Sequence, residues 1–335
     1  MIDRRSLGSI AELLWLIAPH PVLAQRANRL PRIARISTEV PLAENIGPDP
    51  IHPFSRALVH GLRDLGWVDG RNVIIEHRST DGRPERLGAL LRGVVGLPVD
   101  VIVTGGSAAA LAACRATSTI PIVAIGPSLV ALGLANSFAR PGGNVTGLSF
   151  DTGTAIVGKR LEWLKRALPG ARRIAYIRPR PSAGQLPWSA ETAEAARALG
   201  LELTLVAADG PDDFDAAFVE MLRQRPDAIS GVDSPLNIGN RARIIEFAAR
   251  ERVPVVFGLR QFTEAGALIS YGVNLPEVER RAALYVDKIL KGAKPGELPI
   301  EQPTRFELVI NLKTAAALGL KLSQELLLSA DEVIT

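Results

Sequence analysis

The chain has 335 residues, which is more than one compact core usually holds and enough for two. Hydrophobic residues make up 47% and charged residues 22% of the sequence, an ordinary globular composition that excludes a disordered chain. The formal net charge is only +4 with Lys and Arg scattered along the chain, which argues against nucleic-acid binding, and the single cysteine, Cys114, excludes an internal disulfide.

The first 24 residues have the order of a secretory signal peptide. A short basic start, Met1 to Arg5, precedes an apolar stretch, Leu13 to Ala18, and an A-x-A-like cleavage pattern that ends at Ala24. The basic start also loosely matches a twin-arginine signal, so Sec and Tat export both stay open. The alternative is an amphipathic first helix of the mature fold, because Glu12 interrupts the apolar stretch. We expect residues 1–24 to be a signal peptide, and no later segment has the ~18 continuous apolar residues of a membrane span.

From Arg32 onward, short apolar runs alternate with longer segments of helical period. The predicted strands of this first series are 32–37, 72–76, 99–104 and 120–125, and the predicted helices are 54–65, 85–95 and 107–116. The first of these helices is followed by Gly66, a common stop residue. Because the strands are apolar almost throughout, the alternation predicts a parallel sheet covered by helices on both faces.

The same alternation restarts after residue 160. The predicted strands are 173–177, 203–207, 228–232, 253–257 and 268–271, and the predicted helices are 161–167, 189–199, 213–223 and 240–250. Between the two series, residues 139–147 are rich in turn-forming residues and predict a crossing. Two α/β series in one chain predict two similar lobes.

The segment from Thr104 to Ala108 joins a predicted strand to a predicted helix. Ligands of open parallel sheets sit beyond the carboxyl ends of the strands. At this end Gly105 and Gly106 allow a close backbone approach. The amides of the helix start, with Ser107 as the expected N-cap, can hold a carboxylate or another acceptor. The alternative is a tight turn that every such fold needs.

Polar and aromatic residues also end the predicted strands of the second series. The candidate ligand-binding residues there are Asp233, Ser234, Phe257, Gly258, Tyr271 and Gly272. A carboxylate at this position can pair with a ligand ammonium group, whereas the alternative is a turn that caps the next helix. Each aromatic ring can form one wall of an apolar slot, with core packing as the alternative.

Signals for catalysis or a bound cofactor are weak. Residues 153–160 mimic a phosphate-binding loop, but Arg160 replaces the hydroxyl residue that binds magnesium, and no apolar strand leads into the segment. The four histidines lack the spacing of a metal site, and the sequence has no G-x-S-x-G elbow. We therefore expect no catalytic residues, no metal site and no cofactor.

Several longer stretches carry a family resemblance. They are residues 61–72, 116–123, 139–147, 283–295 and 301–315. On these stretches the chain resembles the ABC-transporter substrate-binding family of periplasmic binding proteins, which includes tryptophan- and tyrosine-type binders. The resemblance runs from about Arg32 to the end. It implies an α/β architecture of the type I periplasmic-binding fold, in which two Rossmann-like lobes with parallel sheets hold a solute between them.

The resemblance also implies three crossings between the lobes, near Gly147, near 271–274 and near 302–306. The N-terminal lobe would comprise residues 32–147 plus 274–301. The C-terminal lobe would comprise residues 148–273 plus 302–335. In this arrangement, we expect Asp233 and Tyr271 to face Ser107 across the closed cleft, with Asp233 as the polar anchor and Tyr271 as an aromatic wall.

The chain departs from the family pattern at two strand ends. After 120–125, relatives usually have an Asp-Pro pair, but here Gly126 and Pro127 follow; after 173–177, relatives often have Asn-Pro, but here Arg178 follows. Losing an acid and gaining a base at the cleft should weaken the recognition of an ammonium group. The remaining candidate ligand-binding residues are Ser37, Thr38, Pro127, Ser128 and Arg178.

The resemblance implies an exported, periplasmic solute-binding component of an ABC importer rather than an enzyme. Its partners would be a small organic solute, with amino-acid-like and aromatic solutes as candidates, and the transporter permease; we expect a monomer that neither binds nucleic acid nor spans the membrane. The alternative is a ligand-sensing regulator or signalling module on the same fold. A regulator needs roughly 50 to 60 residues of DNA-binding domain before the first strand, and only about 30 are present. A hydrolase or transferase would need a nucleophile and a base that the sequence does not supply.

Overall fold

The computed structural model describes residues 29–126, 129–150, 153–180, 189–302 and 305–335. The expected signal peptide and the candidate residues Pro127 and Ser128 lie outside these ranges. Contacts divide the chain into Met1–Leu30 and one compact unit, Pro31–Thr335, which carries every feature that follows.

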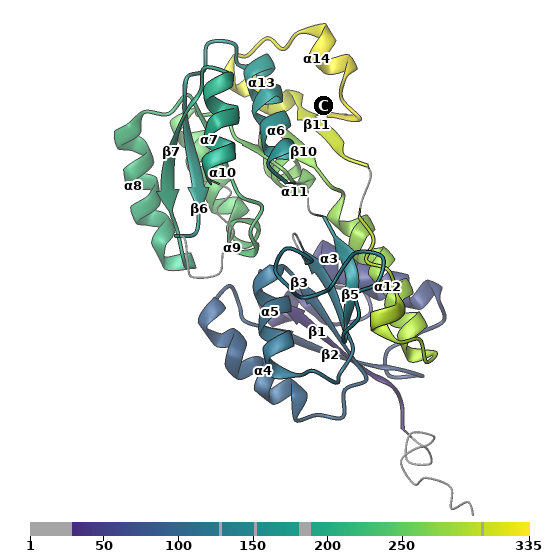
Figure 1. Ribbon diagram of the computed structural model, residues 1–335. Helices are drawn as coiled ribbons and strands as arrows, with labels where there is room; N and C mark the ends of the chain where they lie inside the picture. The colour runs from purple at the N-terminus through teal and green to yellow at the C-terminus, as the bar shows by residue number, and fades with distance from the viewer. Residues whose placement is uncertain (1–28, 127–128, 151–152, 181–188, 303–304) are drawn as a thin grey trace, which may run out of the picture. The chain divides into compact units, whose positions relative to one another are not determined.

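A five-stranded parallel sheet forms the first half of this unit (Figure 1). Its strands, in the spatial order β2-β1-β3-β4-β5, are β2 (Ile74–Ser79), β1 (Arg32–Ser37), β3 (Val101–Gly105), β4 (Ile122–Gly126) and β5 (Val145–Ser149). Four helices cover it: α3 (Pro53–Asp64), α4 (Leu87–Val95), α5 (Ser107–Ala116) and α12 (Leu275–Leu290). Helices α3 and α12 pack on the face that carries Ile33, whereas α4 and α5 pack on the face that carries Ala34. Both faces of the sheet are therefore covered by helices, which explains why the central strands β3 and β4 are apolar almost throughout.

A second sheet is built from the later strands. Strands β7 (Glu202–Ala207), β6 (Arg173–Arg178) and β8 (Ala228–Gly231) are parallel, and a bridge between Ile229 and Val255 continues the order towards β9 (Val256–Phe257). Strands β10 (Ile269–Gly272), β11 (Glu307–Asn311) and β12 (Glu332–Ile334) follow. Strand β11, which the sequence did not predict, runs antiparallel to β10. The chain reaches β11 from the first half, so it enters the sheet from the opposite end.

The helices of the second half lie on both faces of its sheet. They are α6 (Gly153–Ala167), α7 (Ser189–Ala198), α8 (Phe214–Gln224), α9 (Pro235–Gly239), α10 (Arg241–Glu251), α11 (Arg260–Ala265), α13 (Leu312–Leu318) and α14 (Gln324–Leu328). Helices α6 and α7 share a core with Ile174, whereas α8 and α10 share a core with Ala175, its neighbour in β6. Successive side chains of the strand thus pack against opposite layers of helices.

Most predicted elements are confirmed, and some bounds match to the residue. Strand β1 and helix α5 begin and end at the expected residues. Strand β5, in contrast, begins within residues 139–147, which the sequence predicted to be a connection between the two series. Gly147, in β5, has φ +136, and a Cβ there would collide with the backbone of Ala124 in β4. The glycine that resembles a turn signal is therefore needed for close strand pairing.

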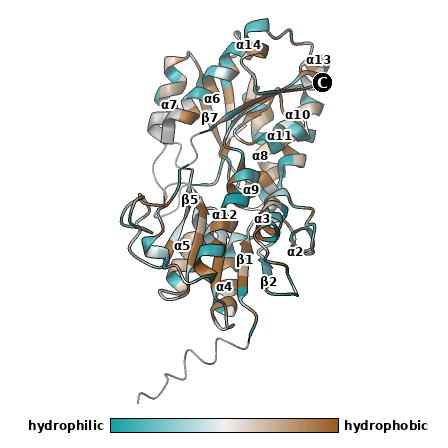
Figure 2. Cartoon of the chain, turned by 90° about the vertical axis from the view of Figure 1, so that its right-hand side faces the viewer, coloured by the Kyte–Doolittle hydropathy of each residue, from teal (hydrophilic) through white to brown (hydrophobic). Residues whose placement is uncertain are grey.

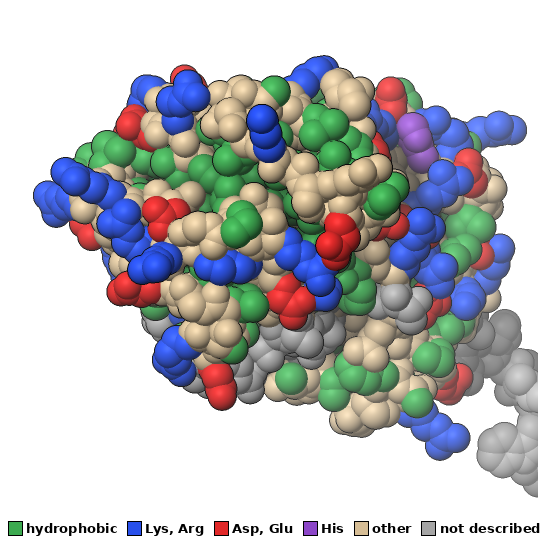
Figure 3. All heavy atoms as spheres, turned by 90° about the horizontal axis from the view of Figure 1, so that it is seen from above, with side chains coloured by type: hydrophobic (Ala, Val, Ile, Leu, Met, Phe, Trp, Pro, Cys, Tyr) green, Lys and Arg blue, Asp and Glu red, His purple; other side chains and the backbone are tan. Residues whose placement is uncertain are grey.

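The surface is mixed in character. Hydrophobic residues concentrate on the strands and on one side of the helices (Figure 2), and Figure 3 shows a face where Lys and Arg are interspersed with Asp, Glu and hydrophobic side chains. Within the described part of the chain, helices long and apolar enough to cross a membrane are absent.

Candidate functional site

The carboxyl edge of the first sheet gathers buried hydroxyl groups. Ser37 ends β1 and is followed by Thr38, Thr80 directly follows β2, and Thr104 lies in β3 opposite Ile36 of β1. All four side chains are buried, and none of their hydroxyls has a hydrogen-bond partner among the described residues. A buried hydroxyl without a partner costs about 1 to 3 kcal/mol, so such a concentration indicates a surface built to meet a polar ligand.

The turn between β3 and α5 has a different helix N-cap residue from the one that the sequence predicted. The N-cap of α5 is Gly106, which offers no side chain, and the expected N-cap Ser107 is instead the first helical residue. Gly106 has φ +82, and a Cβ there would lie 3.2 Å from Cγ of Pro235 at the start of α9. The turn therefore faces an element of the second half, and Gly106 is needed both for its backbone angle and for this approach. Ser107 is half-buried and Ala108 is exposed.

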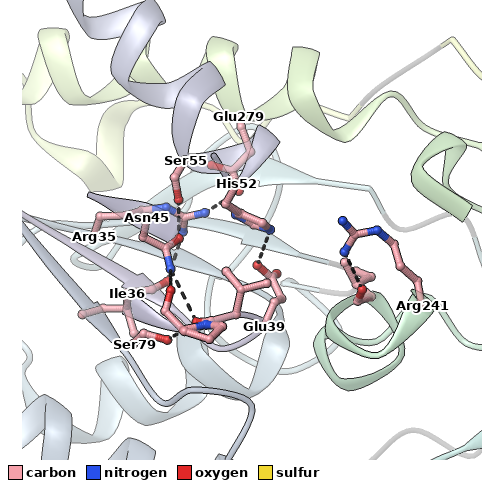
Figure 4. A network of polar contacts seen from close by, with 12 residues as sticks. Arg35, Ile36, Glu39, Asn45, His52, Ser55, Ser79, Arg241 and Glu279 are labelled. Carbon is pink, nitrogen blue, oxygen red and sulfur yellow. Dashed lines mark hydrogen bonds and ion pairs between the residues drawn. The ribbon is translucent and has the colours of Figure 1, made fainter. Parts of the chain in front are cut away.

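A network of charged side chains lies behind this edge (Figure 4). Arg35 of β1 is 1% exposed and donates from Nη2 to Oε1 of Glu279, a buried residue of α12, over 2.8 Å. Gly105 packs against the same guanidinium group, because a Cβ there would lie 3.4 Å from Nη1 of Arg35. Near this pair, Oε2 of Glu39 lies 3.4 Å from Nε2 of His52, which immediately precedes α3. None of these acids and bases was among the residues expected to form the site.

Burial controls the protonation of this network. It raises the pKa of the Glu39 carboxyl, against the opposing effect of Arg35 and Arg241. Burial and, to a lesser extent, the same two arginines lower the pKa of His52 to about 3. Burial raises the pKa of Glu279 to about 7, against the effect of Arg35. At neutral pH, His52 is therefore uncharged, and its contact with Glu39 is not an ion pair.

In the second half, Asp233 is engaged with protein groups. Its Oδ2 accepts from Nη2 of Arg160 over 2.7 Å, and its Oδ1 accepts from the amide of Gly258 over 2.9 Å. Arg160, on α6, is 3% exposed and also donates to the carbonyls of Gly231 and Tyr271. The pair therefore ties α6 to the ends of β8, β9 and β10, and the charge of Asp233 is compensated by Arg160.

Ser234, the residue after Asp233, caps the next helix, which was the alternative to ligand binding that the sequence left open. Ser234 is the N-cap of α9, and its hydroxyl accepts from the amide of Asn237. Asn237 in turn donates to the carbonyl of Val232, which closes the turn after β8. The side chain of Ser234 is thus used in capping a helix.

The two aromatic candidates pack against other rings. Phe257 is fully buried and stacks on Phe262 of α11, with ring centroids 4.0 Å apart. Tyr271 is half-buried between Trp163 and Phe306, with centroid distances of 6.1 and 6.2 Å. This packing supports the alternative interpretation of Phe257 as a core residue.

The two glycines that follow these rings have close neighbours. A Cβ on Gly258 would collide with Asp233 and Arg160, and a Cβ on Gly272 would collide with the backbone of Gly258. Both positions therefore require glycine so that β10, β9 and the Asp233–Arg160 pair can approach one another.

Arg178, at the end of β6, is 8% exposed, and its Nε donates to the carbonyl of Pro179.

A polar pocket of about 290 Å³ lies elsewhere, where the segments before and after α12 meet β5. Leu148, Arg281, Glu301 and Glu307 are among its lining residues. Among the described residues, clusters of His, Cys, Asp and Glu that could hold a metal ion are absent.

Comparisons with known proteins agree with this architecture. Residues 43–334 match the family model described as ABC transporter substrate binding protein. A curated relative, the tyrosine-binding protein of Clostridioides difficile, is 23% identical over 297 residues, which cover 87% of this chain and 84% of the relative.

Two solved structures superpose with a TM-score of 0.80 over 91% of this chain and 100% of theirs. One is a conserved domain protein from Vibrio cholerae, 25% identical, and the other is an ABC domain in complex with L-Trp from Streptococcus pneumonia, 20% identical. The expected α/β architecture of the type I periplasmic-binding fold is confirmed.

Proposed function

Because the chain belongs to the ABC transporter substrate-binding protein family, we propose that it is the solute-binding component of an ABC importer. It binds a small organic solute between the two sheet-containing halves and carries out no chemistry. One observation supports this most: buried hydroxyls without partners among the described residues gather at the carboxyl edge of the first sheet, where such sheets bind ligands.

The two halves act as lobes in this proposal. Residues 32–147 plus 274–301 form the first lobe, and residues 148–273 plus 302–335 form the second. The packing of α12 against α3 and the pairing of β11 with β10 support this division, because each late element joins the half that the division assigns to it. Solute bound between the lobes favours the closed arrangement, which a permease can then recognise.

The solute is amino-acid-like or aromatic. The tyrosine-binding relative and the neighbour solved with L-Trp support this choice. Ser37, Thr38 and the Gly105–Gly106 turn would contact the solute from the first lobe. Arg178 would approach from the second lobe, where its positive charge suits a carboxylate.

The importer role places the protein outside the cytoplasmic membrane, in the periplasm. The order of the first 24 residues supports a cleaved signal peptide, with either Sec or Tat export. N-terminal sequencing of the protein from a native envelope fraction should find a chain that begins near Gln25, whereas intact Met1 on cytoplasmic protein would contradict export.

The binding function is tested by native mass spectrometry of gently purified protein. A small organic molecule should leave the protein on denaturation. Thr104→Val removes a hydroxyl at the strand edge without changing the side-chain shape, so this variant should fold but retain much less solute. Thr263→Val is the matched control, because Thr263 on α11 also has a buried hydroxyl without a partner among the described residues but lies beside the amino end of β10, where Asn311 donates to its carbonyl. Equal retention by both variants would contradict the placement of the site.

A further inference from the structure

Glu39 is a buried acid on the edge where the proposed solute binds. It follows Ser37 and Thr38 at the end of β1, and its side chain is 6% exposed. Its Oε2 has no hydrogen-bond partner among the described residues, and neither do the hydroxyls of Ser37 and Thr38. These three consecutive residues therefore carry acceptor atoms that the described chain leaves unused.

The neighbours of Glu39 do not supply a matched donor. His52 lies 3.4 Å away, but both of its ring nitrogens also lack hydrogen-bond partners among the described residues, and the ring is neutral at physiological pH. Arg35 makes its ion pair with Glu279 and also donates to the carbonyl of Ile36. A buried carboxylate in this position is costly unless a cation reaches it.

Glu39 also lies at the boundary with the second half. A Cβ on Gly239, at the end of α9, would collide with the carbonyl of Glu39. Arg241 follows at the start of α10, and Figure 4 shows its side chain extending towards Glu39 while Nη1 donates to the carbonyl of Ile238. A solute between the halves would therefore be within reach of Glu39 and of groups from both sheets.

We propose that Glu39 determines specificity by binding a protonated amine of the solute, with the Ser37 and Thr38 hydroxyls as further acceptors. This inference rests on the solute-binding function proposed above. An ammonium group has three donors, which matches one carboxylate and two hydroxyls. Asp233 cannot take this role as readily, because Arg160 already compensates its charge.

The site also links amine binding to protonation. Four groups face Glu39: Arg35 from β1, His52 before α3, Glu279 from α12 and Arg241 from α10. Burial raises the pKa of Glu39, so the empty site holds a proton more tightly than an exposed glutamate does. A bound ammonium favours the ionised carboxylate, so amine binding releases a proton and affinity rises with pH until Glu39 is ionised without solute.

Isothermal titration calorimetry with matched solute pairs tests the assignment. The pairs are L-tyrosine with desamino-tyrosine and L-tryptophan with desamino-tryptophan, together with any solute released in native mass spectrometry. Glu39→Gln should weaken the amine of a binding pair by roughly tenfold to a hundredfold and leave its desamino partner unchanged. The affinity of the wild type for the amine should rise as the pH increases above about 4.3, the ordinary pKa of a glutamate, and Glu39→Gln should flatten this rise.

Two further variants complete the experiment. Glu85→Gln removes an exposed acid of the same half and should bind as the wild type does. Glu39→Asp keeps the charge and should retain the preference for the amine, which separates the charge from a general packing effect.

The failure of this inference can be told from the failure of the proposed function. If Glu39→Gln binds the amines as tightly as the wild type, the role of Glu39 is overturned and solute binding stands. The same holds if only desamino compounds bind, or if the released solute has no basic nitrogen. If no molecule is released and no compound binds, both proposals are overturned.

Discussion

Gly258 shows how one backbone position can control a charged pair. A Cβ at Gly258 would overlap both Oδ2 of Asp233 and Nη2 of Arg160, so Gly258→Ala must separate the pair. Because the pair is largely buried, we expect a loss of about 3 to 5 kcal/mol in the free energy of unfolding, measured by urea denaturation. Gly143→Ala is the control, because a Cβ there meets no atom within 4 Å. Equal midpoints for the two variants would show that the pair tolerates the methyl group.

Residue identities alone predicted part of the candidate site. Gly105 and Gly106 stand at the expected turn, and Arg160 was singled out, but only as the residue that breaks a phosphate-loop pattern. Glu39 was missed although it follows Thr38 directly, because an acid just after a strand is most often a solvated turn residue. Its burial arises from α3 and α9, which approach from other parts of the chain.

At the scale of elements, the contact between α3 and α12 is set by a glycine. A Cβ on Gly61 of α3 would lie 2.8 Å from the carbonyl of Arg280 and 3.0 Å from Cβ of Ala283. Gly61→Ala should therefore push the helices apart and lower the unfolding temperature, although alanine is the better helix former. Gly93→Ala in α4, where a Cβ meets nothing within 4 Å, should instead stabilise the protein by about 0.5 to 1 kcal/mol. An unchanged or higher unfolding temperature for Gly61→Ala would contradict this account of the helix contact.

Most elements as far as β10 were predicted, but none of the later ones was, including the 16-residue helix α12. The expected strand 253–257 is confirmed at its last two residues, which form β9. Helices α9 and α11 were not predicted, because their five and six residues are too few to show a period. The start of α9 is set by Ser234 as a cap, and β9 is set by its pairing with β10.

At the scale of the whole molecule, the buried histidines and the buried glutamates should change the free energy of unfolding in opposite directions as the pH falls. His52 and His77 have pKa values lowered mainly by burial to about 3 and about 4, so the unfolded chain takes up protons first and stability falls as the pH drops below about 6.5. Glu39 and Glu279 have pKa values raised by burial, to about 7 for Glu279, so stability falls as the pH rises above about 4.3. The two effects overlap between these limits and should partly cancel.

Single substitutions separate the two effects in urea titrations at several pH values. Compared with His52→Gln, the wild type should lose up to about 1.4 kcal/mol per pH unit as the pH falls from about 6.5 to about 4. For Glu39 the direction is reversed. Compared with Glu39→Gln, the wild type should become less stable to unfolding as the pH rises over the same interval. Parallel curves for all three proteins would show that neither group changes its protonation on folding.

The sequence by itself determined the architecture and the family. The alternation of apolar strands and amphipathic helices is a local property, readable within about ten residues, and it predicted the buried parallel sheets and the bounds of β1 and α5. Only the tertiary structure decided which side chains meet. Arg35 pairs with Glu279, 244 positions away, and Arg160 pairs with Asp233, because the fold brings distant strand ends and helices together. No local pattern encodes such contacts, since each depends on how strands order within a sheet and which helix covers them.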